Sequence, residues 1–476
     1  MERNRPIAAA FAALHWALLA AAYGRLAEKA YLRFPTDWDF LAYHFPGALA
    51  TYGLTTYTPE PRLVAVIAGF PPLPRIVEGA LVLVTGRFSA AALLNFVGVA
   101  ALVAGLLWLY GRALSLRWLL TALLAVPLCL IHLTSGYVDL FTACWLVLAL
   151  AALSELEPGA RRSRAGAWLA IGALAAAQLA KFQSWPIAGI VGAAVLWRLF
   201  ALARADAPSR RALAVQAAVL VLALGAWPVR NLVEFHNPVY PVRFPLAPGL
   251  FPNATIDADS GVYNMAPWLA EAPRPLRFVA SALEWNRFYS GERFYWSIDA
   301  SAHGDPARSP HHRLGGWFPW TLAALALGAA AAVRRKRVPR SAQAVFAAAV
   351  ALVAFLPQNH ELRYWLFIPV ALAVATARAL ASERPPRVVG PMLAAGALFV
   401  VWSVRPFAID ARLPAALAPR GAREFWAAQA AHPTRGPIRV CDVNPDGIFY
   451  AGPTFREYDV VACFSWETSK GGDTAK

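Results

Sequence analysis

A stretch of residues suited to proton transfer follows the first apolar segment of the chain. Residues 34–46 contain two carboxylates, Asp37 and Asp39, followed by Tyr43 and His44. A carboxylate held beside a substrate hydroxyl can take up its proton as a general base. In a chain that is 58% hydrophobic and 15% charged, this cluster indicates a functional site. Asp39 and Asp37 are therefore the candidate catalytic residues.

The rest of the chain consists mainly of long Ala-, Leu- and Val-rich stretches separated by short loops rich in Arg. Apolar stretches of about 18 or more residues are typical of transmembrane helices, and the mean hydropathy of the 476 residues is +0.46. The composition predicts an all-α polytopic membrane protein. Its net charge of +16 comes from Arg-rich loops that orient helices and meet anionic lipid, so no nucleic-acid partner is expected.

The charge pattern predicts eleven transmembrane helices with the N-terminus in the cytoplasm. Arg3 and Arg5 precede the first helix, and eleven spans place every short Arg-rich loop on their side, as the positive-inside rule requires. The first helix is expected to be retained, because no small-residue cleavage site follows it. The predicted spans are residues 7–27, 88–110, 118–134, 137–153, 166–183, 186–203, 212–229, 316–333, 341–356, 364–381 and 388–404.

Two segments between these spans are assigned differently. The apolar part of residues 72–86 is short for a span, and a crossing there would place every later Arg cluster outside. We therefore expect an amphipathic helix lying in the outer interface. Residues 230–315 are too polar to cross and form a long outer loop. Arg230 and Asn231 open this loop, where they either bind substrate or form a structured turn.

Residues 1–405 are expected to form a transmembrane catalytic domain, and 406–476 a small extracytoplasmic α/β module. The module should contain a helix over 422–431, strands over 438–443 and 458–463, and a disordered end over 470–476. Cys129 and Cys144 lie in predicted spans and are interpreted as packing residues. For Cys441 and Cys463 in the module, a disulfide and a pair of buried thiols are both open.

With this topology the chemically able residues gather at the outer face, whereas the cytoplasmic loops hold almost only Arg. Ionisable groups cost about 2.5–3.5 kcal/mol each at the centre of a span. At a helix end beside water the cost falls, and a functional role becomes the default hypothesis. The candidate substrate-binding residues are Tyr43, His44, Asp139, Lys181, Arg230, Asn231, Tyr240, Glu361 and Arg363.

Several of these residues also have a structural interpretation. Asp37 and Asp139 are of the type that caps helix N-termini. Lys181, near a helix end, can extend its ammonium group to the interface. Arg363 precedes two aromatic residues and can act as an interfacial anchor, while His44 can be a hydrogen-bonded spacer. The shared location of these residues, rather than any one of them, indicates a site.

A cavity with one carboxylate and several cations suits the transfer of a sugar from a polyprenyl phosphate. The carboxylate takes the proton of an acceptor hydroxyl as its oxygen attacks the anomeric carbon, which inverts that centre. The cations stabilise the negative charge that grows on the departing phosphate. A lipid-linked donor also explains why the site lies at the membrane.

Other donors and cofactors find little support. No Gly-rich phosphate loop lies on the cytoplasmic side, which disfavours a nucleotide-sugar donor. No spacing of His, Cys and carboxylates is specific for a metal, and no cofactor is predicted. Asp37 and Asp39 leave a divalent cation open, since two carboxylates alone are a weak signal.

Several short motifs follow one another along the chain in an order that can be compared with known families. They are Trp38-Asp39 and Tyr43-His44-x-Pro46, Pro71-Pro72-Leu73, Tyr137-Val138-Asp139, residues 227–231, residues 237–241 and residues 361–365. Over roughly residues 7–405 the chain thereby resembles the GT-C superfamily of integral membrane glycosyltransferases. It is most similar to bacterial relatives of protein O-mannosyltransferases and of the lipid A aminoarabinose transferase. The resemblance implies a polyprenyl-phosphate sugar donor and a catalytic acid in the first outer loop, at Asp39, with Asp37 as the alternative.

Other classes of protein are compatible with part of this pattern. A transporter or flippase of a lipid-linked or anionic substrate would show internal repeats and broken helices near the midplane, and no convincing repeat is present. A glycan ligase or polymerase of another fold would share the cations without needing the acid after the first helix. A non-catalytic assembly factor would tolerate replacement of its acids.

The topology itself is testable. A reporter fused at about residue 60 should be active only outside the cytoplasmic membrane, and one fused at Arg162 only inside, because the two loops flank an odd number of predicted crossings. The opposite pattern would overturn the eleven-span architecture.

Overall fold

The computed structural model describes most of the chain. The described residues are 5–32, 35, 37, 39–54, 61–156, 163–205, 210–243, 249–251, 253, 254, 269, 271–283, 316–404, 406, 407, 438–441 and 460–463. This part of the chain is almost wholly helical, which confirms the predicted all-α membrane class.

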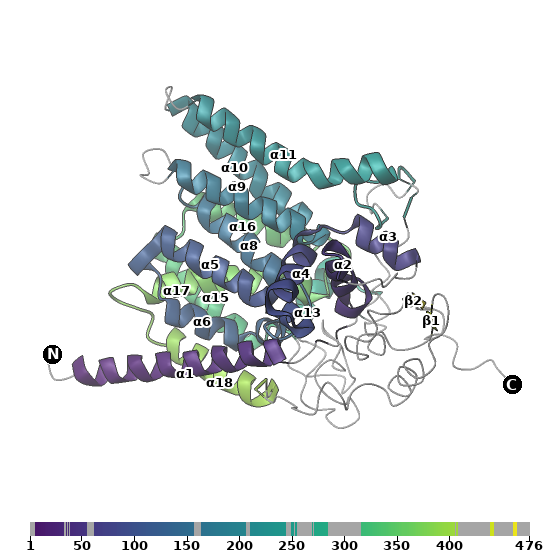
Figure 1. The fold of residues 1–476 in the computed structure, drawn as a ribbon. Helices are drawn as coiled ribbons and strands as arrows, with labels where there is room; N and C mark the ends of the chain where they lie inside the picture. The colour runs from purple at the N-terminus through teal and green to yellow at the C-terminus, as the bar shows by residue number, and fades with distance from the viewer. Residues whose placement is uncertain are drawn as a thin grey trace, which may run out of the picture.

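The longer helices form a bundle (Figure 1). They are α1 (Arg5–Leu32), α5 (Leu94–Tyr110), α6 (Leu116–Ala125), α8 (Asp139–Leu153), α9 (Ser163–Ala180), α10 (Trp185–Ala205), α11 (Arg210–Phe235), α15 (Pro319–Arg334), α16 (Arg340–Val353), α17 (Phe367–Leu380) and α18 (Val389–Val404). Every predicted span overlaps one of these helices. Among the described residues, 5 helices are long and apolar enough to cross a membrane, or up to 6 with a bent pair, and the other apolar helices have 10–17 residues. The number of crossings therefore stays a prediction.

Short helical segments connect the longer helices. They are η2 (Phe40–His44), α2 (Phe45–Thr51), α3 (Pro61–Gly69), α4 (Leu73–Thr85), η3 (Phe88–Leu93), η4 (Gly111–Ala113), α7 (Pro127–His132), η5 (Phe182–Ser184), α13 (Arg274–Ala282) and η9 (Leu362–Trp365). The bent pair is α3 and α4, which meet at 101°. Pro71 and Pro72 lie at this bend, where proline removes the donors that a continuous helix would need. The interfacial position of α4 stays a prediction.

Helix α8 is the centre of the bundle. All of its residues except Trp145 are buried, as expected for a helix that is apolar on every side. It packs against α5, α9, α10 and α17. Helices α1 and α11, in contrast, expose large apolar side chains such as Phe11 (68%) and Leu222 (70%). These exposed apolar faces are compatible with a lipid environment, in which the exposure of apolar side chains costs no free energy.

Two helix ends differ from the prediction. Helix α11 continues through Pro228 to Phe235, although the predicted span ended at 229. A proline within a helix removes one backbone hydrogen bond, because it has no N–H group. Packing against neighbouring helices stabilises α11 beyond this position. Arg230 and Asn231 therefore lie in the last turns of α11 and not in a loop. The predicted span 118–134 is divided into α6 and α7 at Pro127.

The tail is described only at two short strands, β1 (Ile438–Cys441) and β2 (Val460–Cys463). They pair in parallel, with Cys441 opposite Cys463 in the register. The predicted helix over 422–431 and the end over 470–476 lie outside the described residues, as do the two cysteine side chains. The module and the disulfide therefore stay predictions. Cys129 and Cys144 are buried free thiols, as packing residues should be.

A glycine sets the distance between η2 and the loop that precedes α8. A Cβ atom added at Gly136 would lie 2.3 Å from Cγ of Phe40, a side chain that is itself fully buried. Because neither side can yield without moving backbone, the two segments meet closely only if residue 136 is glycine.

The substitution Gly136→Ala should lower the thermal midpoint of the detergent-solubilised protein, because overpacking typically costs about 1–3 kcal/mol. Gly172→Ala is the matched control, since nothing lies within 4 Å of its added Cβ and alanine is the better helix former. Equal midpoints for the two variants would contradict the close contact.

Candidate functional site

A buried ion pair joins the first loop after α1 to the start of α17. Asp39 lies just before η2 and Arg363 lies in η9, with 3.1 Å between Oδ2 and Nη1. The side chains are 15% and 12% exposed, so water screens their attraction far less than at a surface. Arg363 is thus the partner of Asp39 and not a simple interfacial anchor.

Two tyrosines fix the orientation of the Arg363 guanidinium. The Cζ atom of Arg363 lies 4.3 Å from the ring centre of Tyr137 and 4.9 Å from that of Tyr364. Nη2 donates a hydrogen bond to the Tyr364 hydroxyl at 3.1 Å, and Oε2 of Glu361 is 3.8 Å from Nε. In the described part of the chain, Nε and Nη1 make no hydrogen bond of good geometry. Arg363 therefore has two N–H directions to offer to an anionic oxygen.

A second buried ion pair lies beside the first. The Lys181 ammonium contacts Oδ1 of Asp139 and lies 4.2 Å from the ring centre of Tyr364. Tyr364 therefore touches both cations. The structural interpretations of these residues do not hold, because Lys181 is only 12% exposed and Asp139 caps no helix end.

Asp37 has a different role from Asp39. Its Oδ2 atom accepts a hydrogen bond from the backbone N–H of Gly136 at 2.6 Å, and the residue is buried. This bond ties the loop after α1 to the loop before α8. Asp37 therefore bridges two loops, whereas Asp39 faces the Arg363 guanidinium.

Asn95 and His132 belong to the same neighbourhood, although the sequence analysis did not single them out. Asn95 donates to the carbonyls of His132 and Tyr137 at 2.8 and 2.7 Å. Nε2 of His132 lies 3.4 Å from Oδ2 of Asp139. Both residues are 0% exposed and lie in predicted spans. Polar groups are expensive there, which is the signal that would have identified them.

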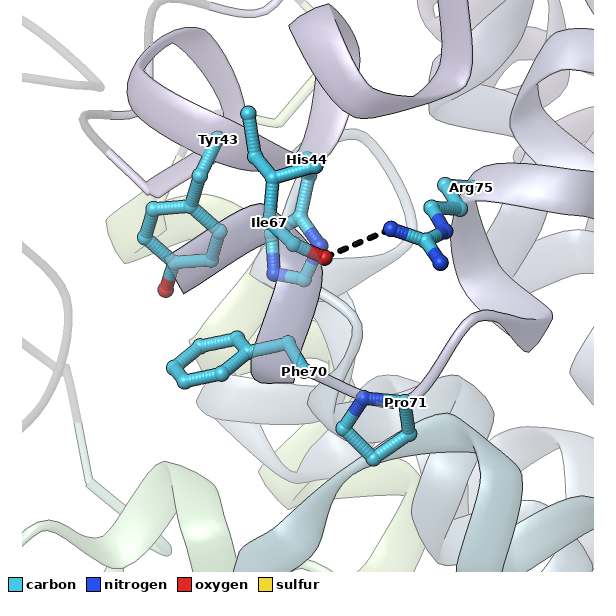
Figure 2. Close-up of a pocket in the computed structure, with 6 residues that line it drawn as sticks. All are labelled: Tyr43, His44, Ile67, Phe70, Pro71 and Arg75. Atoms are coloured by element: carbon cyan, nitrogen blue, oxygen red, sulfur yellow. Dashed lines mark hydrogen bonds between the residues drawn. The ribbon is translucent and has the colours of Figure 1, made fainter. Parts of the chain in front are cut away.

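A small cavity lies next to this cluster (Figure 2). It is lined by Tyr43, His44, Ile67, Phe70, Pro71 and Arg75. Nη1 of Arg75 donates to the Ile67 carbonyl at 2.6 Å, the bond drawn in Figure 2. Tyr43 packs on both His44 and Phe70, with ring centres 4.6 and 5.2 Å apart. Arg75 is a further cation that the motifs did not reveal.

Burial controls the ionisation of the groups beside the cavity. It lowers the pKa of His44 to about 4, even though the Asp39 carboxylate favours the charged imidazolium. It raises the pKa of Glu361 to about 7, against the stabilising charge of Arg363. It also raises the pKa of the Tyr43 hydroxyl well above its usual value. Near neutral pH, His44 is therefore uncharged, and the Glu361 carboxyl group is about half protonated.

Arg230, Asn231 and Tyr240 contact the end of α3 and not the ion pairs. Arg230 donates to the Ala68 carbonyl at 2.6 Å, and Asn231 donates to the carbonyls of Gly69 and Tyr240 at 3.0 and 3.2 Å. These bonds satisfy carbonyls that the end of a helix leaves open. The three residues support the cavity wall, because Phe70 follows Gly69 directly.

The two acidic residues after α1 point to different partners, which bears on the divalent cation that the sequence left open. Asp37 binds Gly136 and Asp39 faces Arg363. The described residues include no group of three or more His, Cys, Asp or Glu side chains placed to hold a metal ion. No cofactor is predicted, and a divalent cation at Asp37 and Asp39 stays an open alternative.

The shifted pKa of His44 predicts how stability depends on pH. The unfolded chain takes up the His44 proton near pH 6.5, whereas the folded chain does so only near pH 4. The unfolded state therefore binds more protons in this window, and the free energy of unfolding falls as the pH drops through it. His44→Gln should flatten the fall of the melting temperature between pH 7 and pH 4.5. An unchanged slope would show that His44 is not the group responsible.

Comparison with solved structures finds ArnT from Cupriavidus metallidurans in two states. Its apo crystal structure is 15% identical, with a TM-score of 0.52, and the match covers 98% of this chain and 88% of that one. The structure bound to undecaprenyl phosphate is 14% identical, with a TM-score of 0.51 and coverage of 95% and 86%. No protein-family model and no curated protein matches the chain.

At this level of identity the likeness establishes the fold. It covers nearly the whole chain and includes both ends of the segment from which the GT-C resemblance was inferred. The chain therefore shares its fold with ArnT from Cupriavidus metallidurans.

Proposed function

We propose that this protein is an inverting glycosyltransferase that moves a sugar from a polyprenyl phosphate to an acceptor hydroxyl. The reaction takes place at the outer face of the cytoplasmic membrane, with the N-terminus inside and the C-terminal module outside. The observation that carries the proposal is the Asp39–Arg363 pair beside the Asp139–Lys181 pair. It places one accessible carboxylate among fixed cations at the edge of an apolar bundle.

Asp39 is the proposed general base. It accepts the proton of the acceptor hydroxyl while that oxygen forms a bond to the anomeric carbon of the sugar. The bond between this carbon and the phosphate oxygen breaks, and its electron pair leaves with the polyprenyl phosphate. Asp37 is less suited to this role, because its Oδ2 is occupied by the Gly136 N–H.

Arg363 and Lys181 are the proposed cations for the leaving phosphate. The Nε and Nη1 groups of Arg363 face carboxylates but make no hydrogen bond of good geometry among the described residues, and a phosphate oxygen would supply one. Binding there would also draw Arg363 from Asp39 and leave that carboxylate free to act as a base. Lys181 stays oriented by Asp139 and Tyr364. Such fixed charges stabilise a transition state without reorganising.

The cavity beside Arg75 is the proposed entrance for the donor headgroup. Arg75 is held by a backbone carbonyl, so its charge is not cancelled there by a carboxylate. Tyr43, His44 and Phe70 line the same cavity and offer ring faces to a sugar. In support, a structure with the same fold was solved with undecaprenyl phosphate bound.

A transporter or flippase of the same lipid is the alternative function. It would use the cations to bind the phosphate but would need no base. Two observations distinguish these functions. A transferase forms a new glycosidic bond when purified protein, donor and acceptor are the only components, and this reaction requires the Asp39 carboxylate.

The test uses purified protein in lipid vesicles, a panel of sugars linked to undecaprenyl phosphate, and candidate hydroxyl acceptors. Wild-type protein should form a glycoside, and Asp39→Asn should lower kcat by about 10²–10⁴-fold, the usual contribution of a general base. Asp37→Asn is the matched control and should lose less activity. If both variants transfer at the wild-type rate, or if the lipid only crosses the bilayer, the proposal is wrong.

A further inference from the structure

A histidine lies behind the second ion pair. His132 ends α7, its side chain is 0% exposed, and the side chain of Asp139 is 0% exposed as well. Burying two polar groups among apolar helices is costly unless each finds a partner. The pair therefore calls for a role beyond filling space.

The ring nitrogens of His132 have distinct partners. Nδ1 lies 2.6 Å from the carbonyl oxygen of Leu128, and a carbonyl only accepts hydrogen bonds, so Nδ1 carries a hydrogen. Nε2 lies 3.4 Å from Oδ2 of Asp139. Because Asp139 is also the carboxylate partner of Lys181, this contact is a hydrogen bond when Nε2 carries a proton and donates it to Oδ2. His132 is thereby anchored to its own helix on one side and to Asp139 on the other.

The carboxylate of Asp139 is held on both oxygens. Oδ2 faces His132, while Oδ1 contacts the Lys181 ammonium. The other charged and titratable groups that interact electrostatically with Asp139 are Arg363, Tyr137, Tyr364, Glu361 and His44. With both oxygens bound, the carboxylate cannot rotate freely, so Lys181 has a fixed place beneath Tyr364.

One asparagine fixes the backbone on both sides of the pair. Asn95 donates to the carbonyl oxygen of His132 at 2.8 Å. Its Oδ1 accepts the N–H of Phe141, two residues after Asp139, at 2.9 Å. Asn95 of α5 therefore ties the end of α7 to the start of α8, and it also binds the Tyr137 carbonyl in the loop between them. Such supporting shells are how active sites hold their geometry.

We propose that His132 is a positioning residue for sugar transfer, acting through Asp139 to hold the Lys181 ammonium beside the Asp39–Arg363 pair. This inference rests on the proposed function. His132 touches no substrate, because its side chain is 0% exposed. Its effect reaches the reacting groups only through the Asp139 carboxylate.

Two amide variants separate the contacts of His132. The glutamine amide reaches the position of Nε2, so His132→Gln keeps a donor for Asp139. The asparagine amide reaches the position of Nδ1, so His132→Asn keeps the bond to Leu128 and loses the one to Asp139. Both variants are uncharged, which makes each the control of the other.

We expect His132→Asn to lower kcat by about 10-fold to 100-fold, the loss that orienting partners of active-site groups typically cause. His132→Gln should lose clearly less, and KM for the donor should change little in either variant. The double variant with Asp139→Asn should be no slower than Asp139→Asn alone, because the two residues act in series. Equal losses in both amide variants, or a greater loss in His132→Gln, would overturn the proposal.

The contact can also be measured without substrate. His132→Asn and Asp139→Asn should each lower the melting temperature. The double variant should lower it by less than the sum of the two single effects, because each substitution removes the same contact. Additive losses would show that the residues do not interact and would refute the inference. If the contact is present but the wild type transfers no sugar, the proposed function fails, and the role of His132 in transfer fails with it.

Discussion

The site depends on the cost of placing charge inside an apolar bundle. A carboxylate or a guanidinium buried without a partner costs several kcal/mol, and lipid outside the helices offers no water to relieve it. Asp39 and Asp139 are therefore each joined to a cation from a distant part of the chain. These pairs bring the loop after α1, the end of α9 and the start of α17 together, so the geometry of the site follows from charge neutralisation.

This arrangement gives the two acids different tasks. Asp139 is enclosed at the start of α8 by Lys181 and His132, so it orients a cation. Asp39 faces Arg363 but keeps part of its surface open. A site that binds an anionic donor needs more cations than its own carboxylates neutralise. Arg75 at the cavity wall is one such additional cation. The donor phosphate in the proposed reaction would enter a network already arranged for an anion.

Much of this architecture could be predicted from the sequence. Hydropathy located the helices, and the positive-inside pattern placed Asp39, Asp139, Lys181 and Arg363 at one end of them, where the structure also brings them together. The pairings themselves were not predictable, because nothing local in the sequence links residue 39 to residue 363. The environment of Arg230 was predicted wrongly, because the polar residues from 230 onward were assigned to a loop, whereas α11 continues to Phe235.

The residues that were missed share one property. Asn95 and His132 lie inside apolar stretches, where a search for motifs in loops does not look, and Arg75 lies in the segment expected to be an interfacial helix. Their roles depend on contacts across the bundle, such as the bonds from Asn95 to His132 and Tyr137. Such contacts appear only when the helices are assembled.

The end of α3 links the cavity to the lipid. Its final carbonyls are bound by Arg75 of α4 and by Trp227, Arg230 and Asn231 of α11. Helix α11 exposes a broad apolar surface, including Leu222 and Val233, each 70% exposed. A lipid-facing helix adjusts its tilt to the thickness of the bilayer. Because the wall at Phe70 and Pro71 follows the carbonyls that α11 binds, a change in the tilt of α11 would displace that wall.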